Sequence, residues 1–158
     1  MKFSGQAAWI TGASSGIGAA MARALAKQGV RLVLSGRNVS SLEGVAAECG
    51  GDCLILPFEA TDQAAILPAA DKAWEWSGGI DLLVNNAGIS QRSLAVDTAF
   101  DVYDRIIAVD LLAPIALTQA LLARMVARGS GRIAMISSIA GKVGAPMRTA
   151  YSAAKFGL

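Results

Sequence analysis

The chain has 158 residues, of which 54% are hydrophobic and 16% are charged, and its net charge at pH 7 is +2. This length suits one domain with a substantial core, and this composition excludes a disordered chain. The absence of any basic run gives no indication of nucleic-acid binding. No segment approaches the ~18 consecutive apolar residues of a membrane span, and the apolar run at residues 7–10 is shorter than a secretory signal needs. We therefore expect a soluble, cytoplasmic protein with no membrane partner.

The sequence contains no histidine and only two cysteines, Cys49 and Cys53. The lack of histidine excludes Ser-His-Asp and Cys-His nucleophilic systems and most catalytic zinc sites, so we expect no metal. The two cysteines lie between a predicted helix and a predicted strand. Reduced, partly buried thiols are the favoured interpretation, and a disulfide or metal pair is the alternative.

Short apolar runs alternate with longer, alanine-rich stretches along the chain. The predicted elements, in order, are strand 7–11, helix 16–28, strand 31–35, helix 41–48, strand 53–58, helix 63–76, strand 81–85, helix 100–128, strand 132–137 and a last helix from Thr149. This alternation predicts an α/β fold with a doubly wound, Rossmann-type parallel sheet. Ligands of such folds bind at the carboxyl ends of the strands.

Two local signals mark helix boundaries. Ser40 and Glu43 have the spacing of a capping box, which predicts the start of the second helix. Gly129, Ser130 and Gly131 form a glycine-rich turn, which predicts the end of the fourth helix.

A glycine-rich loop, TGASSGIG at residues 11–18, follows the first predicted strand and opens the first predicted helix. Glycines at such a position allow a sharp turn, a close approach of phosphates and tight packing of the helix on the sheet. The helix N-terminus offers free N–H groups and a positive dipole end to a pyrophosphate. A purely structural turn is the alternative. The predicted cofactor-binding residues here are Gly12, Ser14, Ser15, Gly16, Ile17 and Gly18.

The glycine spacing of this loop resembles that of the short-chain dehydrogenase/reductase family, and later motifs follow in the family's order across the whole chain. The resemblance implies an oxidoreductase that moves hydride between a nicotinamide dinucleotide and a carbonyl or alcohol. An epimerase or dehydratase of the extended branch fits poorly, because both the glycine spacing and the NNAG motif at 85–88 argue against it.

The end of the second predicted strand indicates NADP rather than NAD. Gly36 stands where an NAD enzyme usually has an acidic residue for the ribose diol, and Arg37 follows it. A guanidinium is a suitable partner for a ribose phosphate, and an ordinary solvated arginine is the alternative. After the third strand, the resemblance places Glu59 and Ala60 beside the adenine.

The NNAG motif follows the fourth predicted strand. By resemblance it supports the centre of the sheet and lines the cofactor cleft. Asparagine side chains can bridge strand ends where backbone partners are missing, so we expect Asn85 to be structural. Asn86, Ala87 and Gly88 are predicted to lie against the cofactor.

Ser138 follows the fifth predicted strand, and Tyr151 and Lys155 are four positions apart in the last helix. That spacing places phenol and ammonium on one helix face, where the cation favours the phenolate. By resemblance, Tyr151 is the general acid in reduction and the general base in oxidation, and Ser138 donates to the developing alkoxide. Both Tyr151 and Lys155 also count as cofactor-binding. Ser137 should point to the opposite face of its strand.

Asp110 departs from the family pattern, which has an asparagine at this place that helps to hold a water beside the catalytic lysine. An aspartate changes the local charge. Pro114 has no N–H, so the backbone carbonyl of Asp110 loses its usual helix partner. We expect that carbonyl to preserve the water relay, and we count Asp110 among the catalytic residues.

The chain ends at Leu158, three residues after Lys155, whereas related enzymes continue with further strands and helices. We therefore interpret residues 1–158 as a dinucleotide-binding and catalytic domain that is incomplete at its C-terminus. The alternative is a truncated, inactive nucleotide-binding module. Residues 89–93 and 139–147 form the available substrate wall, which leaves the carbonyl or alcohol substrate open. The resemblance implies a homo-oligomer when the protein is full length.

Overall fold

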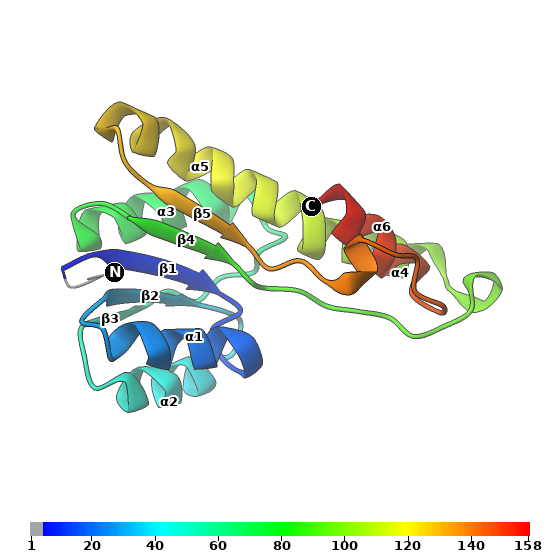
Figure 1. Cartoon of the computed structure of the whole chain (residues 1–158), viewed down its shortest axis with the longest axis horizontal. Helices are drawn as coiled ribbons and strands as arrows, with labels where there is room; N and C mark the ends of the chain where they lie inside the picture. The colour runs from blue at the N-terminus through cyan, green and yellow to red at the C-terminus, as the bar shows by residue number, and fades with distance from the viewer. Residues whose placement is uncertain (1–4) are drawn as a thin grey trace.

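The computed structural model describes residues 5–158 as five parallel strands with helices on both faces of the sheet (Figure 1). The strands lie in the order β3-β2-β1-β4-β5. Their bounds are β1 Ala7–Thr11, β2 Arg31–Ser35, β3 Cys53–Ile55, β4 Leu82–Asn85 and β5 Arg132–Met135. The strand order reverses at β1 and β4, and such a reversal leaves a crevice at the carboxyl ends of the strands. The predicted α/β, Rossmann-type class is confirmed.

The helices form two layers and a separate group. Helices α1 (Gly16–Ala26) and α2 (Val39–Cys49) cover one face of the sheet, while α3 (Gln63–Ser77) and α5 (Ala113–Arg128) cover the other. Helices α4 (Phe100–Ile107) and α6 (Thr149–Gly157) pack together beyond the carboxyl ends of β4 and β5 (Figure 1). The contact with α4 positions α6, the last helix, near the crevice.

Both edge strands are shorter than the sequence predicts. β3 ends at Ile55 rather than at residue 58, and β5 ends at Met135 rather than at residue 137. The sequence remains apolar after β3 has ended, because Leu56 and Phe58 pack into the core beneath α3 and α5. Apolar residues indicate burial, and at these two positions the side chains are buried by helix packing and not by strand pairing.

The predicted capping box at Ser40 is wrong. Helix α2 begins at Val39, and the Asn38 side chain accepts a hydrogen bond from the Ser41 N–H at 3.0 Å. Asparagine is among the strongest N-cap residues. Because Asn38 caps the helix first, Ser40 already lies inside it.

The predicted helix 100–128 is continuous in direction but has a π-helical turn, η2 (Ala108–Leu112), between α4 and α5. The Ala113 N–H donates to the Ala108 carbonyl, five residues back. Pro114, which cannot donate, follows directly. The wide turn contains Asp110, and it aims that side chain at the interior of the α4–α6 group.

Residues Phe100–Arg128 together are long and apolar enough to cross a membrane, judged by length and composition alone. The sequence did not suggest this, because charged and polar residues interrupt every apolar run. In the fold, Leu117, Leu121 and Met125 of this helix are buried against the sheet, and 39% of its most apolar stretch is buried.

Cys49 and Cys53 are both free and half-buried. Burial raises the pKa of each thiol, to about 11 for Cys53. Both side chains are partly buried, free thiols, as the sequence predicts.

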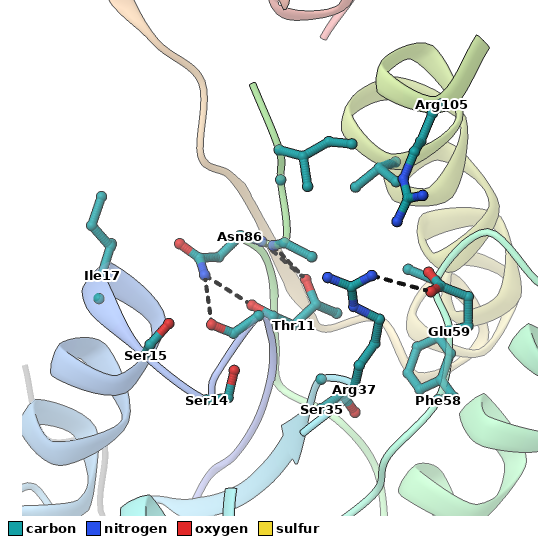
Figure 2. A pocket seen from close by; sticks show the side chains of 18 residues that line it. Thr11, Ser14, Ser15, Ile17, Ser35, Arg37, Phe58, Glu59, Asn86 and Arg105 are labelled. Atoms are coloured by element: carbon teal, nitrogen blue, oxygen red, sulfur yellow. Dashed lines mark hydrogen bonds and ion pairs between the residues drawn. The ribbon is translucent and has the colours of Figure 1, made fainter. Parts of the chain in front are cut away.

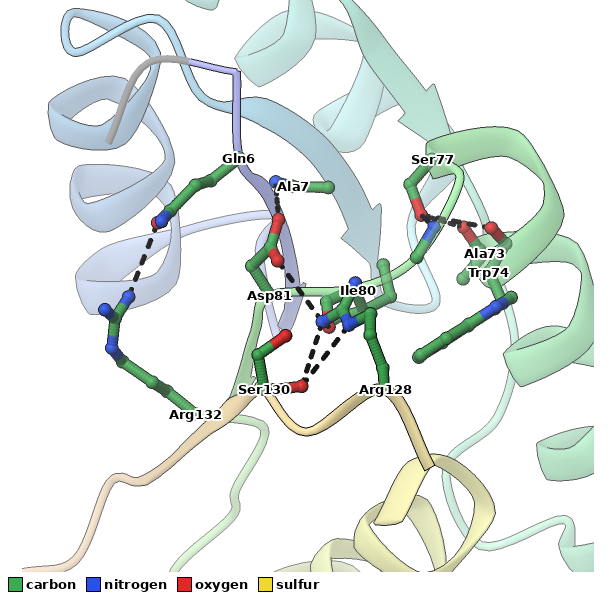
Figure 3. Close-up of polar contacts among 11 residues, drawn as sticks. Gln6, Ala7, Ala73, Trp74, Ser77, Ile80, Asp81, Arg128, Ser130 and Arg132 are labelled. Carbon is green, nitrogen blue, oxygen red and sulfur yellow. Dashed lines mark hydrogen bonds and ion pairs between the residues drawn. The ribbon is translucent and has the colours of Figure 1, made fainter. Parts of the chain in front are cut away.

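Arg128, near the end of α5, joins three segments at the amino end of the sheet (Figure 3). Its Nη2 donates to the Ile80 carbonyl at 2.6 Å and lies 3.2 Å from Oδ1 of Asp81. The other carboxylate oxygen of Asp81 accepts from the Ala7 N–H at 2.9 Å. This network fixes β1, β4 and α5 relative to one another, at the end of the sheet opposite to the crevice.

Replacing Arg128 with Met should lower the free energy of unfolding by about 1–3 kcal/mol, because a charged donor to a backbone carbonyl and to Asp81 is lost together. Chemical denaturation measures this change. Arg132→Met is the matched control, since Arg132 is exposed and makes one 3.4 Å contact with Gln6. Equal effects of the two substitutions would contradict a special role for Arg128.

Candidate active site

A cleft of about 390 Å³ opens at the carboxyl ends of β1, β2 and β4 (Figure 2). Most of the predicted cofactor-binding residues line it, namely Gly12, Ser14, Ser15, Gly16, Ile17, Arg37, Glu59, Ala60, Asn86, Ala87 and Gly88. The three other predicted residues, Gly18, Tyr151 and Lys155, do not line this cleft. Residues from four separate segments, one after each of β1 to β4, thus surround one cavity, as the motif order predicts.

Gly18 has a packing role. A Cβ atom there would lie 2.3 Å from the Gly12 carbonyl oxygen and 2.6 Å from Nδ2 of Asn86. Gly12 itself has φ +64°, and its Cβ would lie 2.9 Å from Cα of Ala87. The two glycines allow the loop, the first turn of α1 and the NNAG segment to approach each other closely.

Thr11 and Asn86 hold the two loops together. The Thr11 hydroxyl oxygen accepts from the backbone N–H groups of Asn86, at 3.0 Å, and Ala87, at 3.1 Å. The Asn86 side-chain amide donates to the carbonyls of Thr11, at 3.0 Å, and Gly12, at 3.2 Å. Thr11 was not among the residues predicted from the sequence, although its hydroxyl at the end of β1 was a signal for such a contact.

Asn85 is buried and structural, as its motif position suggests. Its side-chain amide donates to the Thr118 hydroxyl at 3.2 Å and so joins the end of β4 to α5.

One wall of the cleft is charged. The Arg37 guanidinium lies 3.7 Å from Oε2 of Glu59, and 62% of the Arg37 side chain is exposed. Arg105 points from α4 toward the same space (Figure 2). The sequence did not identify Arg105, because only the fold brings α4 over the cleft. Two cations therefore face this part of the cleft against one carboxylate.

The residues of the cleft fit a dinucleotide. The first turn of α1 contains no acidic residue, and no side chain of the described residues caps it. Its N–H groups are thus free for an anion. The loop glycines give backbone access, and the side of the cleft at Gly36 offers the Arg37 cation. Arg37, Ser14 and the α1 N-terminus would hold phosphate groups.

Tyr151 and Lys155 lie on one face of α6, as predicted from their spacing. The Lys155 Nζ is 5.7 Å from the centre of the Tyr151 ring and donates to the Ile136 carbonyl at 3.1 Å. Lys155 is buried, with 6% exposure, whereas Tyr151 is half-buried. The ammonium is therefore held below the ring, and the ring faces partly outward.

Ser138 lies at the start of the short helix η3 (Ile139–Gly141), where its hydroxyl accepts from the Ala140 N–H at 3.2 Å. Gly141 allows this segment to pack closely against α6, because a Cβ atom there would lie only 2.3 Å from the Lys155 carbonyl oxygen. Ser137 is exposed, and its hydroxyl donates to the Lys155 carbonyl at 3.4 Å. The two serines thus have separate contacts, and the close packing at Gly141 was not predicted.

A network from the segment after β4 supports the start of α6. The Gln91 side chain accepts from the Tyr151 N–H at 3.2 Å and donates to the Thr149 hydroxyl at 3.2 Å. The Arg148 side chain, at the N-cap position of α6, makes no capping hydrogen bond, and the Gln91 side chain makes one in its place. Met147 just before has φ 62°, a strained conformation for a residue with a side chain. These contacts orient the helix turn that bears Tyr151.

Asp110 contacts Lys155 directly. The carboxylate has no exposure to solvent, its Oδ2 lies 3.2 Å from the Lys155 Nζ, and its Oδ1 accepts from the Ile89 N–H at 2.8 Å. Burial raises the pKa of Asp110, while the Ile89 N–H and Lys155 act to lower it. The sequence predicted a role for the backbone carbonyl of Asp110. The structure adds a side-chain contact that the sequence did not reveal.

Comparison with known proteins agrees with this geometry. The family model for short chain dehydrogenase matches residues 6–158. The chain is 42% identical to Dehydrogenase/reductase SDR family member 7 of Homo sapiens, covering 95% of this chain and 46% of the human protein. It is 41% identical to member 7B of Mus musculus, covering 92% of this chain and 47% of the mouse protein. The chain thus spans about half the length of the curated relatives it matches.

A solved structure is also similar. A metagenomic short-chain oxidoreductase, crystallised in complex with NADP, has a TM-score of 0.95 and 39% identity to this chain. The match covers 100% of this chain and 73% of that one. With a family model that spans nearly all of its residues, and with the glycine loop, NNAG segment and Tyr151–Lys155 pair in place, the chain belongs to the short-chain dehydrogenase family.

Proposed function

We propose that the protein transfers a hydride between NADP(H) and a carbonyl or alcohol substrate, with Tyr151 as the general acid in reduction and the general base in oxidation. The observation that supports this most is the Asp110 side chain, which connects Ile89, at the rim of the dinucleotide cleft, to Lys155 beneath Tyr151. This carboxylate links the backbone at the rim of the cleft to the lysine beneath the phenol, which supports a joint role of the two parts.

Each residue has a distinct task in this proposal. In reduction, the Tyr151 phenol gives its proton to the substrate oxygen, and the Ser138 hydroxyl donates a hydrogen bond to the same oxygen. The Lys155 ammonium stabilises the phenolate that remains. The bound dinucleotide supplies or accepts the hydride. In oxidation, the Tyr151 phenolate removes the hydroxyl proton of the substrate.

Two observations favour NADP over NAD. Gly36 leaves the end of β2 without a carboxylate, and Arg37 and Arg105 both face the adjoining part of the cleft. The similar metagenomic enzyme was crystallised with NADP. We propose that Arg37 binds the phosphate on the adenosine ribose and releases Glu59 when it does so.

Initial rates with a panel of aldehydes and ketones test this function. We expect NADPH to be consumed faster than NADH at equal concentration. Arg37→Asp should reduce the preference for NADPH about 10- to 100-fold, because a charge-assisted contact becomes a repulsion. Arg132→Asp, at the opposite end of the sheet, should leave the preference unchanged. Failure of the panel with both cofactors, or no effect of Arg37→Asp, would contradict the proposal.

A further inference from the structure

Asp110 connects two parts of the site that are otherwise separate. One carboxylate oxygen accepts from the backbone of Ile89, which follows the cleft residue Gly88, and the other faces the Lys155 ammonium at 3.2 Å. The π-turn η2 aims the side chain inward, and its exposure is zero. Motion of Lys155 or of the Gly88–Ile89 backbone would therefore disturb the other through this one side chain.

The fit around the carboxylate is close on one side. A Cβ atom at residue 88 would lie 2.8 Å from Oδ2 of Asp110, so glycine is the residue that fits there. Among residues 5–158, no donor makes a well-aligned hydrogen bond to this oxygen. Its charge is balanced by the nearby Lys155 ammonium. Lys155 is therefore the charged group with which the Asp110 carboxylate interacts most strongly.

Two cationic side chains lie near the Tyr151 ring. Lys155 lies beneath the ring on the same helix, and the Arg148 guanidinium lies 5.8 Å from the ring centre. Tyr103 of α4 packs in the same apolar cluster. Asp110 is the one carboxylate, within the described part of the chain, that pairs with Lys155.

We infer that Asp110 is a positioning residue that offsets the positive charge of Lys155, so that the Tyr151 phenol loses its proton at a higher pH than it would beside an unpaired lysine. Phenolate formation is favoured by an uncompensated ammonium and less favoured by a neutral ion pair. The family resemblance places a neutral asparagine at this position, so this chain differs in the charge next to its lysine. The link to catalysis rests on the proposed function of Tyr151, whereas the charge effect itself does not.

The small number of tyrosines in the chain allows the ionisation of Tyr151 to be measured directly. Tyr103 and Tyr151 are the two tyrosines of the sequence, so Tyr103→Phe leaves Tyr151 as the single tyrosine. In that background, the near-ultraviolet absorbance of tyrosinate follows Tyr151 alone during a pH titration of cofactor-free protein. Adding Asp110→Asn should move the midpoint to lower pH by about one unit, a shift typical of removing one nearby charge. Asp101→Asn, at an exposed site on α4, is the matched control.

A second substitution protects the test against a folding defect. Asp110→Ser also removes the charge with a smaller side chain, and it should shift the midpoint in the same direction. Thermal unfolding identifies any variant that does not fold. An unchanged or higher midpoint in a folded variant would overturn the inference.

The pH profile of turnover then connects this effect to the reaction. The pH for half-maximal alcohol oxidation should fall in Asp110→Asn by the same amount as the absorbance midpoint. Because the absorbance titration needs no turnover, its failure is distinguishable from a failure of the proposed function. A shifted midpoint with an unshifted profile would show that Tyr151 is not the catalytic base.

Discussion

Replacing Tyr151 with Phe should lower the rate of carbonyl reduction roughly a thousandfold, the middle of the range for losing a general acid. The substitution removes one hydroxyl and leaves the ring that packs with Ile106 and Ala154. The glycine loop and Arg37 are unchanged, so the affinity for NADPH should stay within a few-fold of the original. Steady-state kinetics and the fluorescence of bound NADPH measure the two effects separately.

Tyr103→Phe is the matched control for this experiment. The Tyr103 hydroxyl contacts the Thr149 hydroxyl at 2.7 Å near the start of α6, so the same atom is lost close to the site. We expect only a few-fold loss, because that contact supports a helix turn and gives no proton to substrate. If Tyr151→Phe keeps most of the activity, Tyr151 is not the acid.

Gly18→Ala should weaken NADPH binding by about 100-fold or more. The added Cβ would lie 2.3 Å from the Gly12 carbonyl oxygen, and that atom is backbone and cannot rotate away. The loop must then shift, which separates the Asn86 amide from the Gly12 carbonyl and displaces the N–H groups at the start of α1. Fluorescence titration with NADPH measures the loss.

Gly44→Ala provides the comparison. Gly44 is also a helical glycine, in α2, but nothing lies within 4 Å of a Cβ built there. Alanine is the better helix former by up to about 1 kcal/mol, so this variant should be slightly more stable and should bind NADPH normally. A normal affinity in Gly18→Ala would mean that the close packing of the loop is unimportant for the cofactor.

The sheet and its crevice could be predicted because their signals are local. Apolar runs such as residues 31–35 coincide with a strand, and the glycine loop at residues 11–18 lies where a strand must meet a helix. A parallel sheet with alternating helices has few allowed topologies. The position of the cofactor residues at the carboxyl ends of the strands follows from that topology alone.

The features of the site that the sequence did not predict depend on contacts between segments that are distant in the sequence. The partner of Asp110 is Lys155, and Arg105 reaches the cleft only because α4 crosses above it. Gln91 caps α6 from across the chain. None of these pairings leaves a periodic signal in the sequence. The π-turn at Ala108–Leu112 was similarly hidden, because Ala108, Leu111 and Leu112 are good helix formers and only Pro114 indicated a break.

The most direct test of the central claim is the fate of the transferred hydrogen. The protein is incubated with NADPH in which both hydrogens of the reactive nicotinamide carbon are replaced by deuterium and with a ketone from the active panel, and the alcohol is analysed by mass spectrometry. We expect one deuterium on the carbinol carbon of each product molecule, and almost no alcohol with Tyr151→Phe. Alcohol that forms without deuterium would show that the hydride does not come from the cofactor, and it would contradict the account.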